Sequence, residues 1–145
     1  ARILSAGFES DIVEDLREYP TAQPIDALVD AVDATVVATG AHTAISGHTV
    51  INSIEAITRL SSEEFYRLYG QSTSRALIFT GVTRGESPLV ALRVVTPTPH
   101  AVILHGVDPD SLWPHAAELA AIDGYTLAVS TMPTEAMLPA LQALG

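Results

Sequence analysis

The residues best suited to chemistry occupy a glycine-bracketed loop that follows an apolar run. In TGVTRGES, Gly81 and Gly85 permit backbone conformations that expose N–H groups, and Arg84 supplies a cation. Exposed amides, hydroxyls and an arginine at the start of a helix suit an anion. The predicted ligand-binding members are Thr80, Gly81, Thr83, Arg84, Gly85 and Ser87. The alternative is a glycine-rich turn in which Arg84 pairs with Glu86 or with a neighbouring subunit. It is not a Walker loop, because the glycine spacing differs and the lysine is missing.

Two further apolar runs stop on polar or small residues. VILHG ends at His105 and Gly106, LAVST ends at Ser130 and Thr131, and Thr134 follows shortly after. In open α/β sheets, ligands bind in the crevice outside the carboxyl ends of the strands. If the strands are parallel neighbours, Thr80, Arg84, His105 and Ser130 converge at one edge, where the imidazole can donate to a ligand oxygen.

These runs also predict the fold class. Near-continuous Val, Ile, Leu and Ala segments are typical of strands buried on both faces. We therefore expect an α/β protein with three α/β/α layers and a mostly parallel or mixed central sheet of four or more strands. The expected strands are residues 34–39, 76–80, 101–104 and 126–129.

Helical spacing and breakers predict the elements between the strands. An amphipathic helix over 9–19, ended by Pro20, and a connector over 21–24 form an expected N-terminal unit, followed by an α/β regulatory domain over 25–145. Residues 41–49 are turn-like, and apolar residues from 50 to 60 recur at helical spacing. The remaining expected helices are 25–32, 62–70, 88–93, one within 107–123 ended by Gly124, and 134–144.

Composition limits the partners. The chain has 17 acids, seven arginines and no lysine among 145 residues, which gives a formal net charge of −10. Direct nucleic-acid contact by these residues is not expected, because it requires a Lys/Arg patch.

No apolar run approaches the roughly 18 residues of a membrane span, so a cytoplasmic protein with no membrane partner is expected. Five histidines show no compact metal-ligand spacing, there are no cysteines, and neither a metal nor a cofactor is expected.

From about residue 25 onward, the order of segments resembles the DRTGG domain, a regulatory module found in some phosphotransacetylases and beside paired CBS domains, and related in fold to the N-terminal domain of HPr kinase. LIFTGVTRG matches the family's glycine- and arginine-bearing loop, with Arg84 at or near its arginine. His105 and Gly106 stand where the family has a glycine pair, and Thr134 matches its later threonine. The Asp-Arg-Thr-Gly-Gly string itself does not occur in this chain.

The resemblance implies a non-catalytic regulatory or assembly domain attached to a catalytic or DNA-binding partner, such as the sensor domain of an archaeal transcription regulator. We expect it to sense an anionic metabolite or to mediate oligomerisation in a larger or multi-component system, and to form a homo-oligomer. One alternative is a small enzyme acting on a phosphorylated or carboxylated metabolite, with Arg84 binding the anion, His105 as acid or base, and Asp108 or Asp110 beside it. A second is an interaction module whose contact surface is the aromatic helix over 62–70.

Overall fold

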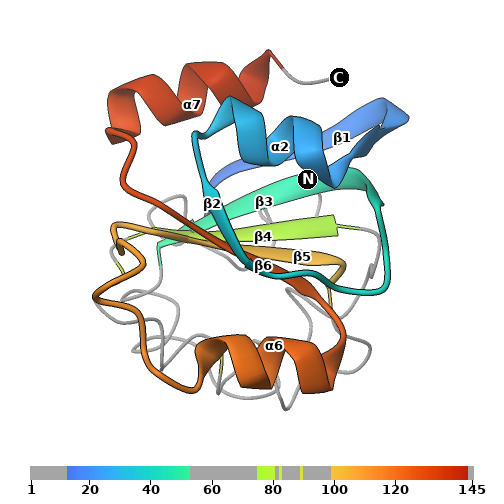
Figure 1. The fold of residues 1–145 in the computed structure, drawn as a ribbon. Helices are drawn as coiled ribbons and strands as arrows, with labels where there is room; N and C mark the ends of the chain where they lie inside the picture. The colour runs from blue at the N-terminus through green and yellow to red at the C-terminus, as the bar shows by residue number, and fades with distance from the viewer. Residues whose placement is uncertain (1–12, 53–74, 81, 83–88, 90–98, 144–145) are drawn as a thin grey trace.

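A six-stranded mixed sheet forms the centre of the molecule (Figure 1). The computed structural model describes residues 13–52, 75–80, 82, 89 and 99–143, except for the side chains of residues 13–18, 52 and 134. The strands are β1 (Val13–Pro24), β2 (Thr35–Ala38), β3 (Ala44–Asn52), β4 (Arg75–Thr80), β5 (Ala101–His105) and β6 (Thr126–Ser130). Their order is β1-β3-β4-β5-β6-β2, with β3 to β6 parallel and both edge strands antiparallel to their neighbours.

Helices cover both faces of the sheet. Helices α2 (Ile25–Ala31) and α7 (Thr134–Gln142) lie over one face, and α6 (Ala116–Asp123) lies over the other (Figure 1). Alternate strand residues divide accordingly: Phe79 and Leu104 pack on the α6 side, whereas Ile78 and Ile103 pack on the α2 and α7 side. The predicted three-layer α/β/α class is confirmed.

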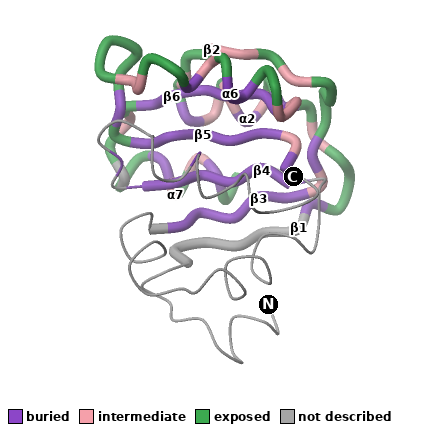
Figure 2. Tube along the Cα trace, turned by 90° about the horizontal axis from the view of Figure 1, so that it is seen from below, coloured by how far each residue is buried: buried purple, intermediate pink, exposed green. Residues whose placement is uncertain are grey.

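The central strands are buried along their whole length (Figure 2). Every residue of β4, β5 and β6 is buried, as the continuous apolar runs predicted. Helix α6 ends at Gly124, whose φ of 87° is left-handed and therefore favours glycine. The predicted helices over 25–32, within 107–123 and over 134–144 are found as α2, α6 and α7. No helix in the described part of the chain is long and apolar enough to cross a membrane.

Two predictions near the N-terminus are wrong. The expected helix over residues 9–19 and the connector over 21–24 are instead strand β1 from Val13 onward, which pairs with β3. The turn expected over 41–49 and the start of the following helix are strand β3. The helix expected over 62–70 lies outside the described residues, as does the one over 88–93 except for buried Leu89. A domain boundary after residue 24 stays a prediction.

The strand expected over residues 34–39 is found as β2, but it does not run parallel to the central strands. Strand β2 is a partly exposed, antiparallel edge strand, so its carboxyl end lies at the edge where the parallel strands begin. Gly40 there packs against the backbone of residues 124–126, at the start of β6. This glycine therefore does not belong to the edge at which β4, β5 and β6 end.

Candidate functional site

Three predicted site residues form a row at the carboxyl edge of the sheet. His105 and Ser130 are register partners on β5 and β6, and Thr80 follows Phe79, the partner of Leu104. By strand alternation all three side chains project to the α2 and α7 face, and all three residues are buried, with exposed fractions of 6% for Thr80, 8% for His105 and 2% for Ser130. Thr80, His105 and Ser130 thus lie at one edge, as expected for neighbouring parallel strands, whereas the place of Arg84 and ligand binding at this edge stay predictions.

The Ser130 hydroxyl joins three segments. Its Oγ donates to the Val32 carbonyl oxygen at the end of α2, at 2.6 Å, and accepts from the Met132 amide, at 3.2 Å. The donor and one acceptor position of this hydroxyl are therefore used within the protein. Ser130 fixes the turn between β6 and α7 against α2, and a nucleophilic role would require breaking these bonds.

The His105 imidazole is held by the same turn. Its Nε2 lies 2.5 Å from the carbonyl oxygen of Met132. Because a carbonyl only accepts, Nε2 carries the proton and donates, which leaves Nδ1 as the ring nitrogen available to a ligand. Within the described contacts no carboxylate touches this ring: Asp108 Oδ1 instead accepts from the Ser111 amide. The expected acid or base pairing of His105 with Asp108 is therefore not formed in this structure.

Gly106 and Val82 bring the start of the predicted anion loop to the end of β5. The Val82 amide donates to the His105 carbonyl at 3.3 Å, and the Gly106 amide donates to the Ser130 carbonyl at 2.8 Å. Gly106 has a left-handed φ of 102°, and a Cβ there would lie 3.0 Å from the Val82 oxygen. Val82, the one described residue of the predicted loop after Thr80, therefore lies directly beside His105.

The rest of the predicted site is only partly described. Gly81, Thr83, Arg84, Gly85 and Ser87 lie outside the described residues. Thr131 is exposed beside Ser130, and Thr134 begins α7, although its side chain is not described. The structure therefore brings Thr80, His105, Gly106 and Ser130 together, with Thr131 at the rim.

Charge at the edge comes from acids alone in the described part. Arg75 is the only arginine whose side chain the structure describes, and it is buried, donating to the His48 carbonyl at 2.9 Å. It lies at the start of β4, at the opposite edge of the sheet. None of the described side chains therefore brings an arginine to the carboxyl edge, and the anion-binding role of Arg84 stays a prediction.

The Val32 and Met132 carbonyls were missed by sequence reasoning, although they orient Ser130 and His105. A backbone carbonyl is present at every residue, so its role leaves no signal in residue types. The nearest signal is the sequence STMP, in which a strand-end hydroxyl precedes a proline-terminated turn.

Two archaeal proteins are similar to this chain in sequence. No family model matches the chain. It is 35% identical over 144 residues to an uncharacterised HTH-type transcriptional regulator of Methanocaldococcus jannaschii, with 99% of this chain and 60% of that protein covered. It is 43% identical over 125 residues to another from Archaeoglobus fulgidus, with 84% of this chain and 54% of that protein covered. The chain thus spans a little over half the length of these relatives.

A solved structure shares the fold. It holds the CBS and DRTGG domains of the regulatory region of Clostridium perfringens pyrophosphatase, complexed with its activator, diadenosine tetraphosphate. The match has a TM-score of 0.57 and 15% identity, and it covers 83% of this chain and 47% of the other. The chain is therefore similar in sequence to archaeal HTH-type transcriptional regulators and shares the fold of a CBS and DRTGG regulatory region, as its resemblance to the DRTGG domain predicted.

Proposed function

We propose that this chain is the ligand-sensing domain of a transcription regulator. The observation that carries the proposal is its similarity, over 99% and 84% of its length, to two HTH-type regulators. The chain has a formal net charge of −10, so DNA phosphates would repel it and we do not expect it to contact DNA itself. Another part of the regulator would bind DNA.

The proposed ligand is an anionic, phosphate-bearing metabolite bound at the carboxyl edge of the sheet. The buried row of Thr80, His105 and Ser130 lies at the carboxyl ends of the strands, the place at which open α/β sheets bind ligands. The activator of the structural neighbour is a dinucleotide with four phosphates. Nucleotides are therefore the first class to test.

Thermal and urea denaturation with a panel of anions tests this proposal. ATP, AMP, diadenosine tetraphosphate, acetyl phosphate and glucose 6-phosphate would each be added to the purified chain. A ligand present at 100 times its dissociation constant should add about 2.7 kcal/mol to the free energy of unfolding. If no member of the panel stabilises the chain, the sensing proposal is wrong.

On this proposal Arg84 contacts the ligand and not the folded core, so Arg84→Ala should remove this stabilisation while changing the stability of the free chain by less than about 1 kcal/mol. Arg93→Ala is the matched control, because it removes the same charge outside the predicted loop and should leave the ligand response intact. A clear loss of stability in Arg84→Ala with the ligand response unchanged would make Arg84 a structural ion-pair partner.

Two substitutions of His105 separate its two nitrogens. A glutamine amide can replace Nε2–H as the donor to the Met132 carbonyl, whereas an asparagine amide replaces Nδ1 and loses that bond. His105→Asn should therefore be less stable than His105→Gln by about 1 kcal/mol in urea denaturation. If Nδ1 contacts the ligand, His105→Gln loses the ligand response. A wild-type response in both variants would exclude His105 from the ligand contact.

A further inference from the structure

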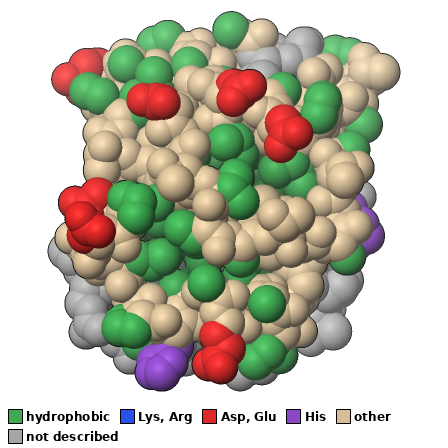
Figure 3. Space-filling model, in the orientation of Figure 1, with side chains coloured by type: hydrophobic (Ala, Val, Ile, Leu, Met, Phe, Trp, Pro, Cys, Tyr) green, Lys and Arg blue, Asp and Glu red, His purple; other side chains and the backbone are tan. Residues whose placement is uncertain are grey.

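Strand β2 carries a partly exposed apolar surface. It is the outermost described strand on its side of the sheet, and Val36 is 42% exposed. Figure 3 shows apolar side chains gathered over this edge, with acids around them and no arginine of the described residues on the same face. We call this surface the β2 face. Its exposed member is Val36, and its partly buried members pack against the core on the α6 side (Val37 and Ala38) or on the α2 and α7 side (Val29, Ala34 and Met132).

Strand β2 is unsuited to pairing with a strand from a partner protein. Strand β2 has only four residues, and its pairing with β6 is irregular between Val36 and Ala38. Short edge strands with bulges are devices that natural proteins use against edge-to-edge pairing. A partner on the β2 face would therefore dock through side chains, with Val36 as the apolar anchor.

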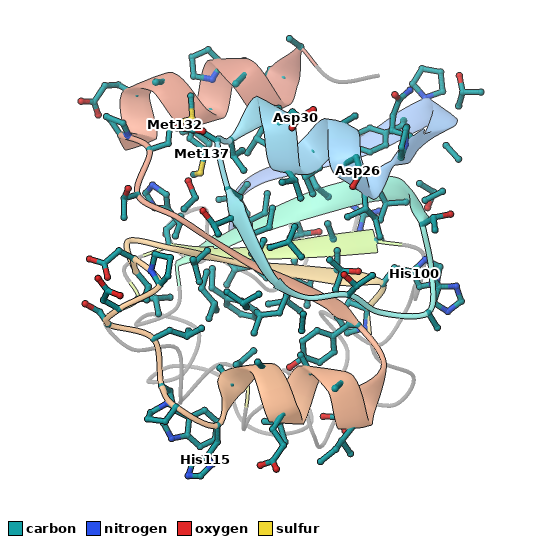
Figure 4. All side chains as sticks on the ribbon, in the orientation of Figure 1. Asp26, Asp30, His100, His115, Met132 and Met137 are labelled. Atoms are coloured by element: carbon teal, nitrogen blue, oxygen red, sulfur yellow. The ribbon has the colours of Figure 1, made fainter. Side chains whose placement is uncertain are left out.

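The surrounding charge selects the kind of partner. Asp26 and Asp30 project from α2 (Figure 4), Asp33 is exposed just after α2, and Glu135 is exposed in the first turn of α7. A second copy would bring the same acids against these, whereas like charges across an interface are unfavourable. An acidic rim around an apolar centre complements a cationic protein surface.

We propose that the β2 face docks the cationic helix-turn-helix module of the regulator. This inference rests on the proposed function, because DNA-binding modules carry the Lys and Arg patches that neutralise phosphates. Docked on the β2 face, those cations meet carboxylates in place of DNA phosphates. Docking and DNA binding then compete for the same module.

The probe is the part of the Archaeoglobus fulgidus regulator outside its match to this chain, purified separately and confirmed as folded by circular dichroism. Titration calorimetry against the 145-residue chain should show saturable 1:1 binding that weakens at least tenfold between 50 and 500 mM NaCl. Val36→Arg should weaken it at least tenfold further. The double variant Asp26→Asn and Asp30→Asn should weaken it about three- to tenfold, and this variant covers the case in which Val36→Arg fails to fold.

Glu118→Gln is the matched control, because it removes one exposed charge on α6 and should leave the affinity unchanged. Absence of binding by the unmodified chain overturns the docking proposal, as does binding that neither variant weakens. A change in the sedimentation coefficient of the chain alone on Val36→Arg overturns it too, because the β2 face would then hold a second copy. Nucleotide stabilisation is measured on the same variants, so a chain that responds to nucleotide without docking refutes only this inference and leaves the sensing proposal standing.

Discussion

Replacing Gly40 by alanine should lower the free energy of unfolding by about 3 kcal/mol, the upper end of the usual cost of overpacking. An ideal Cβ at this position would lie 2.5 Å from the Tyr125 carbonyl carbon and 2.6 Å from both the Gly124 oxygen and the Thr126 nitrogen. All three are backbone atoms, which cannot rotate away as a flexible side chain would. The start of β6 or the segment around residue 40 must shift instead. Urea denaturation followed by circular dichroism measures the loss.

Gly124→Ala is the matched control for this substitution. Gly124 has a left-handed φ of 87°, but a Cβ there would meet nothing within 4 Å. Alanine at this site should therefore lose only the backbone preference, about 1 kcal/mol. Equal losses in the two variants would show that close packing at Gly40 does not carry the effect.

The cost at Gly40 is large because its segment crosses the amino edge of the sheet. After β2, the chain runs past the start of β6, where the Gly40 amide donates to Thr126 Oγ1 at 2.9 Å and the Ala41 amide donates to the Gly124 carbonyl at 3.2 Å. It then stacks His42 on His100 with ring centroids 3.6 Å apart, before entering β3. This crossover holds the antiparallel edge strand to the parallel core.

The central strands could be predicted from the sequence because burial on both faces selects continuous apolar residues. Strands β4, β5 and β6 meet this condition at every residue. Strand β3 does not, since Ser46, Gly47 and His48 interrupt its apolar pattern and favour a turn. In the structure His48 is fully buried, and its Nδ1 lies 2.6 Å from the Tyr19 hydroxyl on β1. The partner that makes this burial tolerable is 29 residues away, so local patterns could not reveal it.

Strand β1 was missed for a different reason. Ile12, Val13 and Leu16 fit one helical face, and acids around them strengthen the helical pattern. Pairing with β3 overrides this local preference, because the edge of the sheet supplies backbone hydrogen bonds to the segment. The parallel core could be predicted from its runs, while both antiparallel edges depended on contacts between distant segments.

The candidate site, like the fold, could be predicted from the sequence only in part. Strand ends at Thr80, His105 and Ser130 could be predicted from where apolar runs stop, and parallel topology aligns them. Their hydrogen-bond partners could not, because they are main-chain carbonyls: that of Ile51 on β3 for Thr80, that of Met132 in the turn before α7 for His105, and that of Val32 at the end of α2 for Ser130. A hydroxyl at a strand end therefore predicts where a site residue lies in the fold, but it does not predict which atoms that hydroxyl binds.

The role of Ser130 is tested by Ser130→Ala, which should lower the free energy of unfolding by about 2 kcal/mol. The substitution leaves the Val32 carbonyl, on a fully buried residue, without its donor at 2.6 Å, and it also removes the acceptor of the Met132 amide. An unsatisfied buried polar group costs about 1–3 kcal/mol, so this loss exceeds that of an ordinary surface change. Urea denaturation of the free chain gives the value.

Thr131→Ala provides the comparison, because it deletes the hydroxyl of the next residue, which is exposed. It should change the free energy of unfolding by no more than about 0.5 kcal/mol. If instead Ser130→Ala were as stable as Thr131→Ala but lost the response to nucleotides, Ser130 would contact the ligand, and its hydrogen bond to Val32 would not be what stabilises the fold. If Ser130→Ala is less stable but still responds to saturating nucleotide, Ser130 has a structural role. Its two hydrogen bonds then hold α2 and the turn before α7 in position over the sheet.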